Sequence, residues 1–217
     1  MDMPASKTKR RRNAAATREA ILTSARLAFA RAGYDGAGVR EIAAGAGVTA
    51  MLVNRYFGSK ERLFAEAIAY TMATPTILTR QTLKSPTLAK DIAAMLVDIT
   101  KTDATPLEGF QIMLRSASSE RAAEIGREQI EKGHQKTLAA ALRGDRAHQR
   151  AALVLSLIAG FQVMRQMIGL SALADAKPDV LIKTLAPLFQ QLIDGDKPDR
   201  GNQRASSKNT PVRGARQ

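Results

Sequence analysis

The chain has 217 residues, 45% of them hydrophobic, which suits one or two small domains with a real core. It has no cysteine and only two histidines, so disulfides and thiolate metal sites are excluded, and we expect no metal and no cofactor. No run of 18 apolar residues occurs, and no apolar signal segment follows the charged N-terminus. We therefore predict a soluble, cytoplasmic protein with no membrane span.

The net charge of +13 is concentrated at the two ends of the chain. Residues 1–60 contain 11 Lys or Arg and 4 Asp or Glu, residues 61–195 contain 16 and 14, and residues 196–217 contain 6 and 2. The middle of the chain is thus nearly neutral, whereas both ends are basic. A basic block at one end is typical either of a solvated arm or of a segment that contacts a polyanion such as nucleic acid.

The first third of the chain has helical periodicity after a polar start. Residues 1–13 are basic and without periodicity, which predicts a disordered arm; it is either a solubilising tail or a contact to DNA phosphates or the minor groove. Gly33 stands where a helix C-terminal glycine belongs, and Ser59 is a good N-cap. Four helices are predicted here, over residues 14–32, 39–46, 50–57 and 60–73.

Helical spacing continues to residue 193, and no alternating strand pattern appears. Further helices are predicted over residues 77–84, 87–100, 106–116, 119–142, 146–173 and 178–193, with the first of these marginal. Pro187 is expected to kink the last helix. The fold class is therefore all-α with about nine helices, followed by a disordered basic tail over residues 196–217.

Residues 39–57 have the pattern of two helices joined by a tight turn. Gly47 provides the turn, and Ala43 is small where the two helices pass close together. A miniature core can form from Ile42, Val48, Val53 and Tyr56. This pattern is typical of a helix-turn-helix, whose second helix enters the major groove of DNA.

The stretch AxLAFARAGYxGxxVREIAAGAGVTxxxVxRYFGSKExLF, which begins at Ala25, resembles the tetracycline-repressor (TetR) family of bacterial transcriptional regulators. The resemblance covers about residues 17–64, and its length, spacing and flanking helices all agree. It implies an N-terminal three-helix helix-turn-helix DNA-binding domain over residues 14–60. It also implies a C-terminal helical ligand-binding and dimerisation domain over residues 61–195.

The resemblance also implies which side chains contact DNA: Arg40, Thr49, Ala50, Met51, Leu52, Asn54, Arg55, Tyr56 and Lys60. Of these, Thr49 and Lys60 would meet phosphates. The family commonly has a tyrosine where this chain has Asn54, so the recognition surface is unusually apolar. Because Asn can bond an adenine edge and Ala or Leu can touch a thymine methyl group, we predict a half-site that contains A/T pairs.

The C-terminal half carries the apolar helices. Residues 146–173 and 178–193 are apolar around most of their circumference, which favours a four-helix homodimer interface, as in the family, over ordinary core. A pocket for an unknown small-molecule effector is predicted with these residues: Met95, Ile99, Phe110, Met113, Phe161, Met164 and Arg165. Gln162, Arg165 and Gln166 interrupt the apolar helix, and either hold the polar end of a ligand or form bonds across the dimer.

These features together predict a DNA-binding transcriptional regulator, a ligand-responsive homodimer that is more often a repressor in this family. It would bind a palindromic double-stranded operator and be released by its effector. Two alternatives remain: a nonspecific architectural DNA-binding protein, and a helical small-molecule-binding protein without a DNA role. No phosphate loop, carboxylate pair or nucleophile elbow appears, so we expect no enzymatic activity. Structural or surface roles are expected for His134 and His148.

Overall fold

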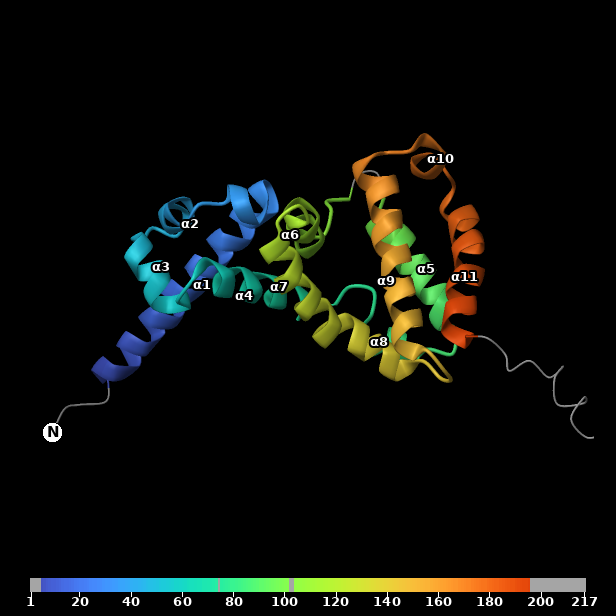
Figure 1. Cartoon of the computed structure of the whole chain (residues 1–217), viewed down its shortest axis with the longest axis horizontal. Coiled ribbons are helices and arrows are strands. Elements are labelled where there is room, and N and C mark those ends of the chain that lie inside the picture. The colour runs from blue at the N-terminus through green and yellow to red at the C-terminus, as the bar shows by residue number, and fades with distance from the viewer. Residues whose placement is uncertain (1–4, 74, 102–103, 196–217) are drawn as a thin grey trace, which may run out of the picture.

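The computed structural model describes residues 5–73, 75–101 and 104–195, with the backbone alone over residues 5–12. The described chain is all-α, without strands, and its helices gather into two halves that lie side by side (Figure 1). One half contains α1–α4 with α6 and α7, and the other contains α5 and α8–α11. No helix in the described ranges is long and apolar enough to cross a membrane.

Helix α1 (Ala5–Gly36) begins nine residues earlier than predicted. The prediction of a disordered arm is therefore wrong for residues 5–13, whose backbone is helical. This segment consists largely of Ala, Lys and Arg, which are strong helix formers, and extending a helix that has already nucleated costs little. Gly33 confirms the predicted helix end: its φ is 68°, and the chain bends there before a last turn. Residues 1–4 and the predicted tail over 196–217 lie outside the described residues.

The next three helices match their predicted bounds closely: α2 (Val39–Gly45), α3 (Ala50–Phe57) and α4 (Lys60–Met72). Both side-chain caps are formed. The Thr49 hydroxyl accepts from the backbone N–H of Leu52 at 3.3 Å, and the Ser59 hydroxyl accepts from that of Arg62 at 3.3 Å. Each cap satisfies an amide that the helix itself leaves unpaired, which explains why these starts are readable in sequence.

The middle of the chain departs more from prediction. The marginal helix over residues 77–84 is only a 3-10 turn, η1 (Thr82–Lys84), and Ile77 and Leu78 are buried in the second core instead. Helices α5 (Leu88–Ile99) and α6 (Glu108–Ser116) follow. The predicted helix over 119–142 is formed by α7 (Glu120–Ile130), the π turn η2 (Glu131–Gln135) and α8 (Lys136–Ala141), which run from one half to the other (Figure 1).

The last predicted pair of helices is interrupted once. Helix α9 (Ala147–Gln162) continues as the π turn η3 (Val163–Met167) and stops before Gly169, whose φ is 72°. A helix to residue 173 is therefore wrong, and the short α10 (Ser171–Ala174) occupies its end. Helix α11 (Pro178–Asp194) includes Pro187, and the kink predicted there stays a prediction.

Two hydrophobic clusters form the core, one in each half. The first is centred on Phe29, Tyr34 and Phe64. The ring of Phe64 meets the other two edge-on, with its centroid 5.0 Å from that of Phe29 and 4.9 Å from that of Tyr34, and the rings of Phe29 and Tyr34 are stacked. It joins α1–α3 to α4, α6 and α7. The helix-turn-helix therefore shares a continuous core with α6 and α7 of the C-terminal region.

Candidate DNA-binding surface and ligand cavity

The turn between α2 and α3 has the geometry of a helix-turn-helix. Gly47 has a φ of 66°, which only glycine adopts without strain. The backbone N–H of Gly47 donates to the carbonyl oxygen of Ala44 at 3.0 Å, and that of Val48 donates to Ala43 at 2.9 Å. These bonds satisfy the last carbonyls of α2 and aim the chain into α3.

Helix α3 separates inward from outward residues. Val53 and Phe57, four residues apart, are buried in the first core. The opposite side carries Met51, which is 80% exposed, together with exposed Asn54 and Arg55. The helix is thus held by one apolar face and presents the other to solvent, as a helix that enters a DNA groove must.

Among the nine predicted DNA contacts, five are exposed: Arg40, Thr49, Met51, Asn54 and Arg55. The other four are half-buried: Ala50, Leu52, Tyr56 and Lys60. All nine come from three successive elements, α2, α3 and the first turn of α4, which pack on one another. No DNA is present, so their assignment as contacts remains a prediction.

Lys60 is already held by an aromatic ring. Its ammonium lies 4.6 Å from the ring centroid of Tyr34. The hydroxyl of that tyrosine has a raised pKa, mainly because of burial. This contact restrains Lys60 at the N-terminus of α4, where backbone N–H groups also favour an anion. A lysine restrained in this way loses less side-chain entropy when it binds a phosphate.

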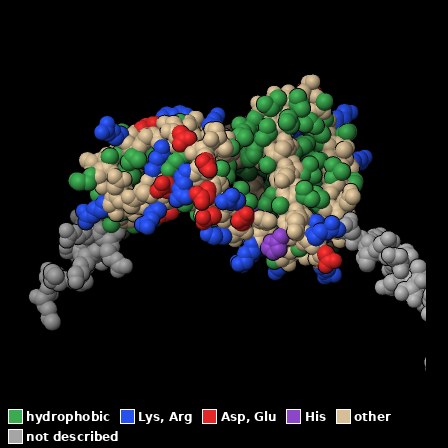
Figure 2. All heavy atoms as spheres, viewed as in Figure 1, with side chains coloured by type: hydrophobic (Ala, Val, Ile, Leu, Met, Phe, Trp, Pro, Cys, Tyr) green, Lys and Arg blue, Asp and Glu red, His purple; other side chains and the backbone are tan. Residues whose placement is uncertain are grey.

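A cavity of about 660 Å³ lies between the two halves. Its walls come from the end of α4, the segment 75–78, α6, α9 and the α7–η2 region, and most lining side chains are apolar. Figure 2 shows the molecule hollowed between its halves, with hydrophobic side chains around the opening. This volume and lining are typical of sites for small apolar molecules.

Only some of the predicted pocket residues line this cavity, and their contact with a ligand stays a prediction. Phe110 and Met113 line the cavity. Three others belong to the second core instead: Met95, Ile99 and Phe161. Met164 is 46% exposed and also lies outside the lining. In this part of α9 and η3, the cavity is lined by Ile158, Ala159, Gly160, Gln162 and Val163. Phe161 packs in the second core and Met164 is exposed, because each position turns the side chain by about 100° around the helix.

Arg165 is the clearest correction. It is 5% exposed and donates to the carbonyl oxygens of Val97 at 2.7 Å and Leu173 at 3.1 Å, away from the cavity. Burial lowers the pKa of this guanidinium. Arg165 therefore does not line this cavity: it connects the ends of α5 and α10 within the chain, and the predicted bond across a dimer stays untested.

Among the polar side chains that line the cavity are Gln162, for which one of the two predicted roles was to hold the polar end of a ligand, and His134, for which no such role was predicted. Gln162 is 4% exposed, and its amide nitrogen Nε2 has no hydrogen-bond partner. His134 also lines the cavity, and burial lowers its pKa below the usual 6.5. A signal for Gln162 existed, since it interrupts an apolar helix. None existed for His134, because η2 is a π turn that shifts the helical register.

The cavity wall is joined directly to α1. Glu108, which lines the cavity, accepts from Arg26 of α1 at 2.7 Å, and both side chains are more than two-thirds buried. The guanidinium of Arg26 also lies 4.1 Å from the ring centroid of Tyr70, a second lining residue. A molecule that fills the cavity therefore touches two side chains that hold the helix at the centre of the first core.

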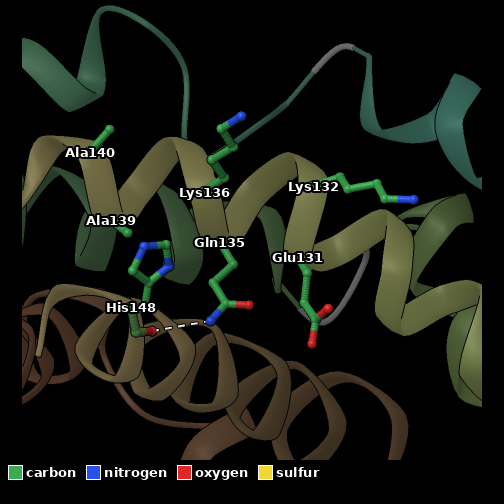
Figure 3. Close-up of a pocket in the computed structure, with 7 residues that line it drawn as sticks. All are labelled: Glu131, Lys132, Gln135, Lys136, Ala139, Ala140 and His148. Atoms are coloured by element: carbon green, nitrogen blue, oxygen red, sulfur yellow. Dashed lines mark hydrogen bonds between the residues drawn. The ribbon is translucent and has the colours of Figure 1, made fainter.

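A second hollow lies where η2 and α8 meet α9 (Figure 3). Five of its seven lining residues are polar or charged, and the Gln135 amide donates to the backbone carbonyl of His148 at 3.2 Å. Lys132 at its rim is paired with Glu128 at 2.8 Å. Because neither buried unpaired polar atom of the described residues lies here, this hollow has less to recognise than the apolar cavity.

The surface over α9–α11 is apolar. The following large hydrophobic side chains there are exposed: Leu153, Met164, Ile168, Leu170, Val180 and Leu188. Figure 2 shows hydrophobic side chains spread over this half, whereas the charged side chains concentrate on the other. A patch of this kind marks a protein-interaction surface.

The fold and these two sites define a helix-turn-helix DNA-binding protein with a separate small-molecule cavity. Two family models match the sequence: bacterial regulatory proteins of the tetR family over residues 21–67, and the tetracyclin repressor-like C-terminal domain over residues 87–193. The chain belongs to the TetR family of transcriptional regulators. The predicted all-α fold, with an N-terminal helix-turn-helix and a C-terminal helical domain, is confirmed.

Solved structures share this fold. A regulator from Rhodococcus sp. has a TM-score of 0.61 at 18% identity, covering 83% of this chain and 100% of its own. A TetR-family regulator from Streptomyces coelicolor A3 has a TM-score of 0.53 at 24% sequence identity, and the match covers 82% of this chain and 95% of that regulator. AibR, solved in complex with isovaleryl coenzyme A and operator DNA, has a TM-score of 0.55 at 16% sequence identity. The match covers 80% of this chain and 97% of AibR. Among curated proteins no significant match is found.

Proposed function

We propose that this protein is a homodimeric repressor that binds a palindromic operator and releases it when a small molecule fills the cavity. The observation that carries the proposal is the ion pair between Arg26 and Glu108, which connects a cavity wall to the core under the recognition helix. AibR, which has the same fold, was solved with both a small molecule and operator DNA. This supports the presence of two communicating sites.

Dimerisation through α9 and α11 supports the symmetry of the operator. The exposed apolar side chains on these helices would be covered by the same surface of a second copy, which is a two-fold arrangement. Two recognition helices that are related by a two-fold axis read two half-sites about 34–36 Å apart, one turn of DNA. The half-sites are then inverted copies of each other.

In the DNA complex, each α3 would lie in a major groove. Asn54 would meet a base edge, Ala50 and Leu52 would touch thymine methyl groups, and the cationic groups of Arg55 and Lys60 would pair with phosphates. This assignment extends the exposure pattern of α3 and α4. It predicts that Asn54 controls base choice, whereas Arg55 controls affinity without regard to sequence.

The ligand acts by changing the relative stability of two states. In one state the two DNA-binding domains of the dimer match the operator, and in the other they do not. If the effector binds the second state more tightly than the first, it favours that state by the difference between the two binding free energies. The tight contact of α1 on α6 provides the connection: a Cβ on Gly33 would lie 2.3 Å from the carbonyl oxygen of Arg115. Movement of α6 therefore requires movement of α1.

Selection of genomic fragments with the purified full-length protein tests the proposal. The expected result is one or a few inverted-repeat sequences, bound far more tightly than random DNA at the same salt concentration. Asn54→Ala is expected to relax base preference at one position of each half-site, whereas Thr23→Ala, an exposed change on α1, leaves it intact. Equal binding to all fragments would support the architectural alternative, and binding to none would remove the DNA role.

A further inference from the structure

The cavity contains one polar side chain whose hydrogen bonding is incomplete. Gln162 is 4% exposed, lines the cavity, and carries an Nε2 with no partner. A buried amide N–H without an acceptor destabilises the folded state, so such groups are rare in proteins. Gln162 lies at the last turn of α9, directly before η3. Its Nε2 has almost no accessible surface, so a rotation of the amide about its terminal bond is needed to present this donor to the cavity.

The charges around the cavity restrict what can fill it. Within the described residues, no Lys or Arg lines the cavity, and its one lining carboxylate, Glu108, is already paired with Arg26. His134 is the remaining ionisable nitrogen of the lining, and burial lowers its pKa below the usual 6.5, which favours the uncharged imidazole. An anionic group would lose its hydration without gaining a cation, which is strongly unfavourable.

We propose that the effector is an uncharged, mainly apolar molecule whose carbonyl-type oxygen accepts a hydrogen bond from Gln162 Nε2. The inference rests on the proposed function, because it specifies the ligand of the same cavity. The apolar walls supply most of the affinity, and Gln162 fixes which end of the molecule enters toward α9. Ketones, esters and amides belong to this class, whereas carboxylates and acyl thioesters that carry anionic carriers do not.

Four probes of equal chain length separate these contributions: 2-decanone, decane, decanoate and decylamine. Each is titrated against the full-length protein at pH 7.5 with the neutral dye N-phenyl-1-naphthylamine in the cavity, and displacement is followed by fluorescence. We expect 2-decanone to bind about three- to tenfold more tightly than decane, which is the effect of one net hydrogen bond. Decanoate and decylamine are expected to bind at least tenfold more weakly than the ketone.

The variant Gln162→Met removes the amide but keeps the length of the side chain. It is expected to abolish the preference for 2-decanone over decane while leaving the affinity for decane unchanged or higher. Leu155→Met is the matched control, because it changes the apolar wall without changing a polar group. This control is expected to affect all four probes equally, and circular dichroism confirms that both variants are folded.

Several results would overturn the inference: equal affinity of the ketone and decane for the wild type, a ketone preference that survives in Gln162→Met, or decanoate binding as tightly as the ketone. Failure of the dye and all four probes to bind would also overturn it. Operator DNA provides a separate readout. Gln162-dependent ketone binding with unchanged operator affinity refutes the ligand switch alone, whereas operator release without any dependence on Gln162 refutes the inference alone.

Discussion

Replacing Gln162 with methionine should stabilise the ligand-free protein, although most core substitutions destabilise. The amide is buried in an apolar wall, and its Nε2 has no partner. An unpaired buried donor costs about 1–3 kcal/mol, and methionine has nearly the same length without that donor. We therefore expect the free energy of unfolding to rise by about 1–2 kcal/mol.

For a protein of this size, 1 kcal/mol shifts Tm by about 2–4 °C, so the expected increase in Tm is about 2–8 °C. The assay is thermal and urea unfolding without ligand, at one fixed protein concentration, because a dimer's apparent stability depends on concentration. A constant urea m-value would show that the change lies in the free energy and not in the denatured state.

Gln166→Met is the matched control, with the same chemical change four residues along the chain. The Nε2 of Gln166 donates to the carbonyl oxygens of Ala104 at 2.8 Å and Ile99 at 3.4 Å. This variant loses those two bonds, but it also removes the Oε1 of Gln166, which is buried without a partner. We therefore expect a net destabilisation of up to about 1 kcal/mol. If Gln162→Met is instead destabilised as much as Gln166→Met, the Gln162 amide has a partner in the ligand-free protein, and the reasoning fails.

Three further predictions concern the fold. Gly33→Ala should lower the free energy of unfolding, measured with urea, by about 3 kcal/mol or more, because φ at this position is 68° and the new Cβ would clash with a carbonyl oxygen of α6. Gly38→Ala is the control and should have little effect, because a Cβ there would meet open space. Arg150→Met should also lower the free energy of unfolding by about 3 kcal/mol or more, since carbonyl groups after α8 and at the end of α11 lose a charged donor. An unchanged Tm would contradict this. The lowered pKa of His134 means that below pH 6.5 the unfolded chain binds more protons than the folded chain, so stability should fall as pH drops through the window below 6.5. His134→Gln should flatten this part of the profile measured by urea unfolding, and His148→Gln should not.

The role of Arg150 illustrates what local sequence cannot show. An arginine in an amphipathic helix is usually read as a surface residue, yet this one is 8% exposed. It donates to the carbonyl oxygens of Asp145 at 3.0 Å and Ile193 at 2.7 Å, which are far apart in sequence. Only the packing of α9 on α8 and α11 brings the segment after α8 and the end of α11 to one point.

The ligand cavity was predicted incompletely for a related reason. Phe110 and Met113 were predicted as adaptable apolar walls in the middle helices. The choice between faces of α9, in contrast, depends on which neighbour each face meets. A rotation of one residue, about 100° around a helix, separates Phe161 in the second core from Gln162 in the cavity. The π turns η2 and η3 change this rotation further, and sequence periodicity does not indicate them.

The sequence by itself determined the helix-turn-helix, because its signals are local: Thr49 and Ser59 as caps, Gly47 for positive φ, and Val53 and Phe57 on one face. Each of these acts within one or two helical turns, so no distant contact is needed to form them. The tertiary structure alone decided the cavity, the unpaired amide of Gln162 and the ion pair of Arg26 with Glu108. These depend on contacts between residues as many as 82 positions apart, and burial and pairing there are set by packing.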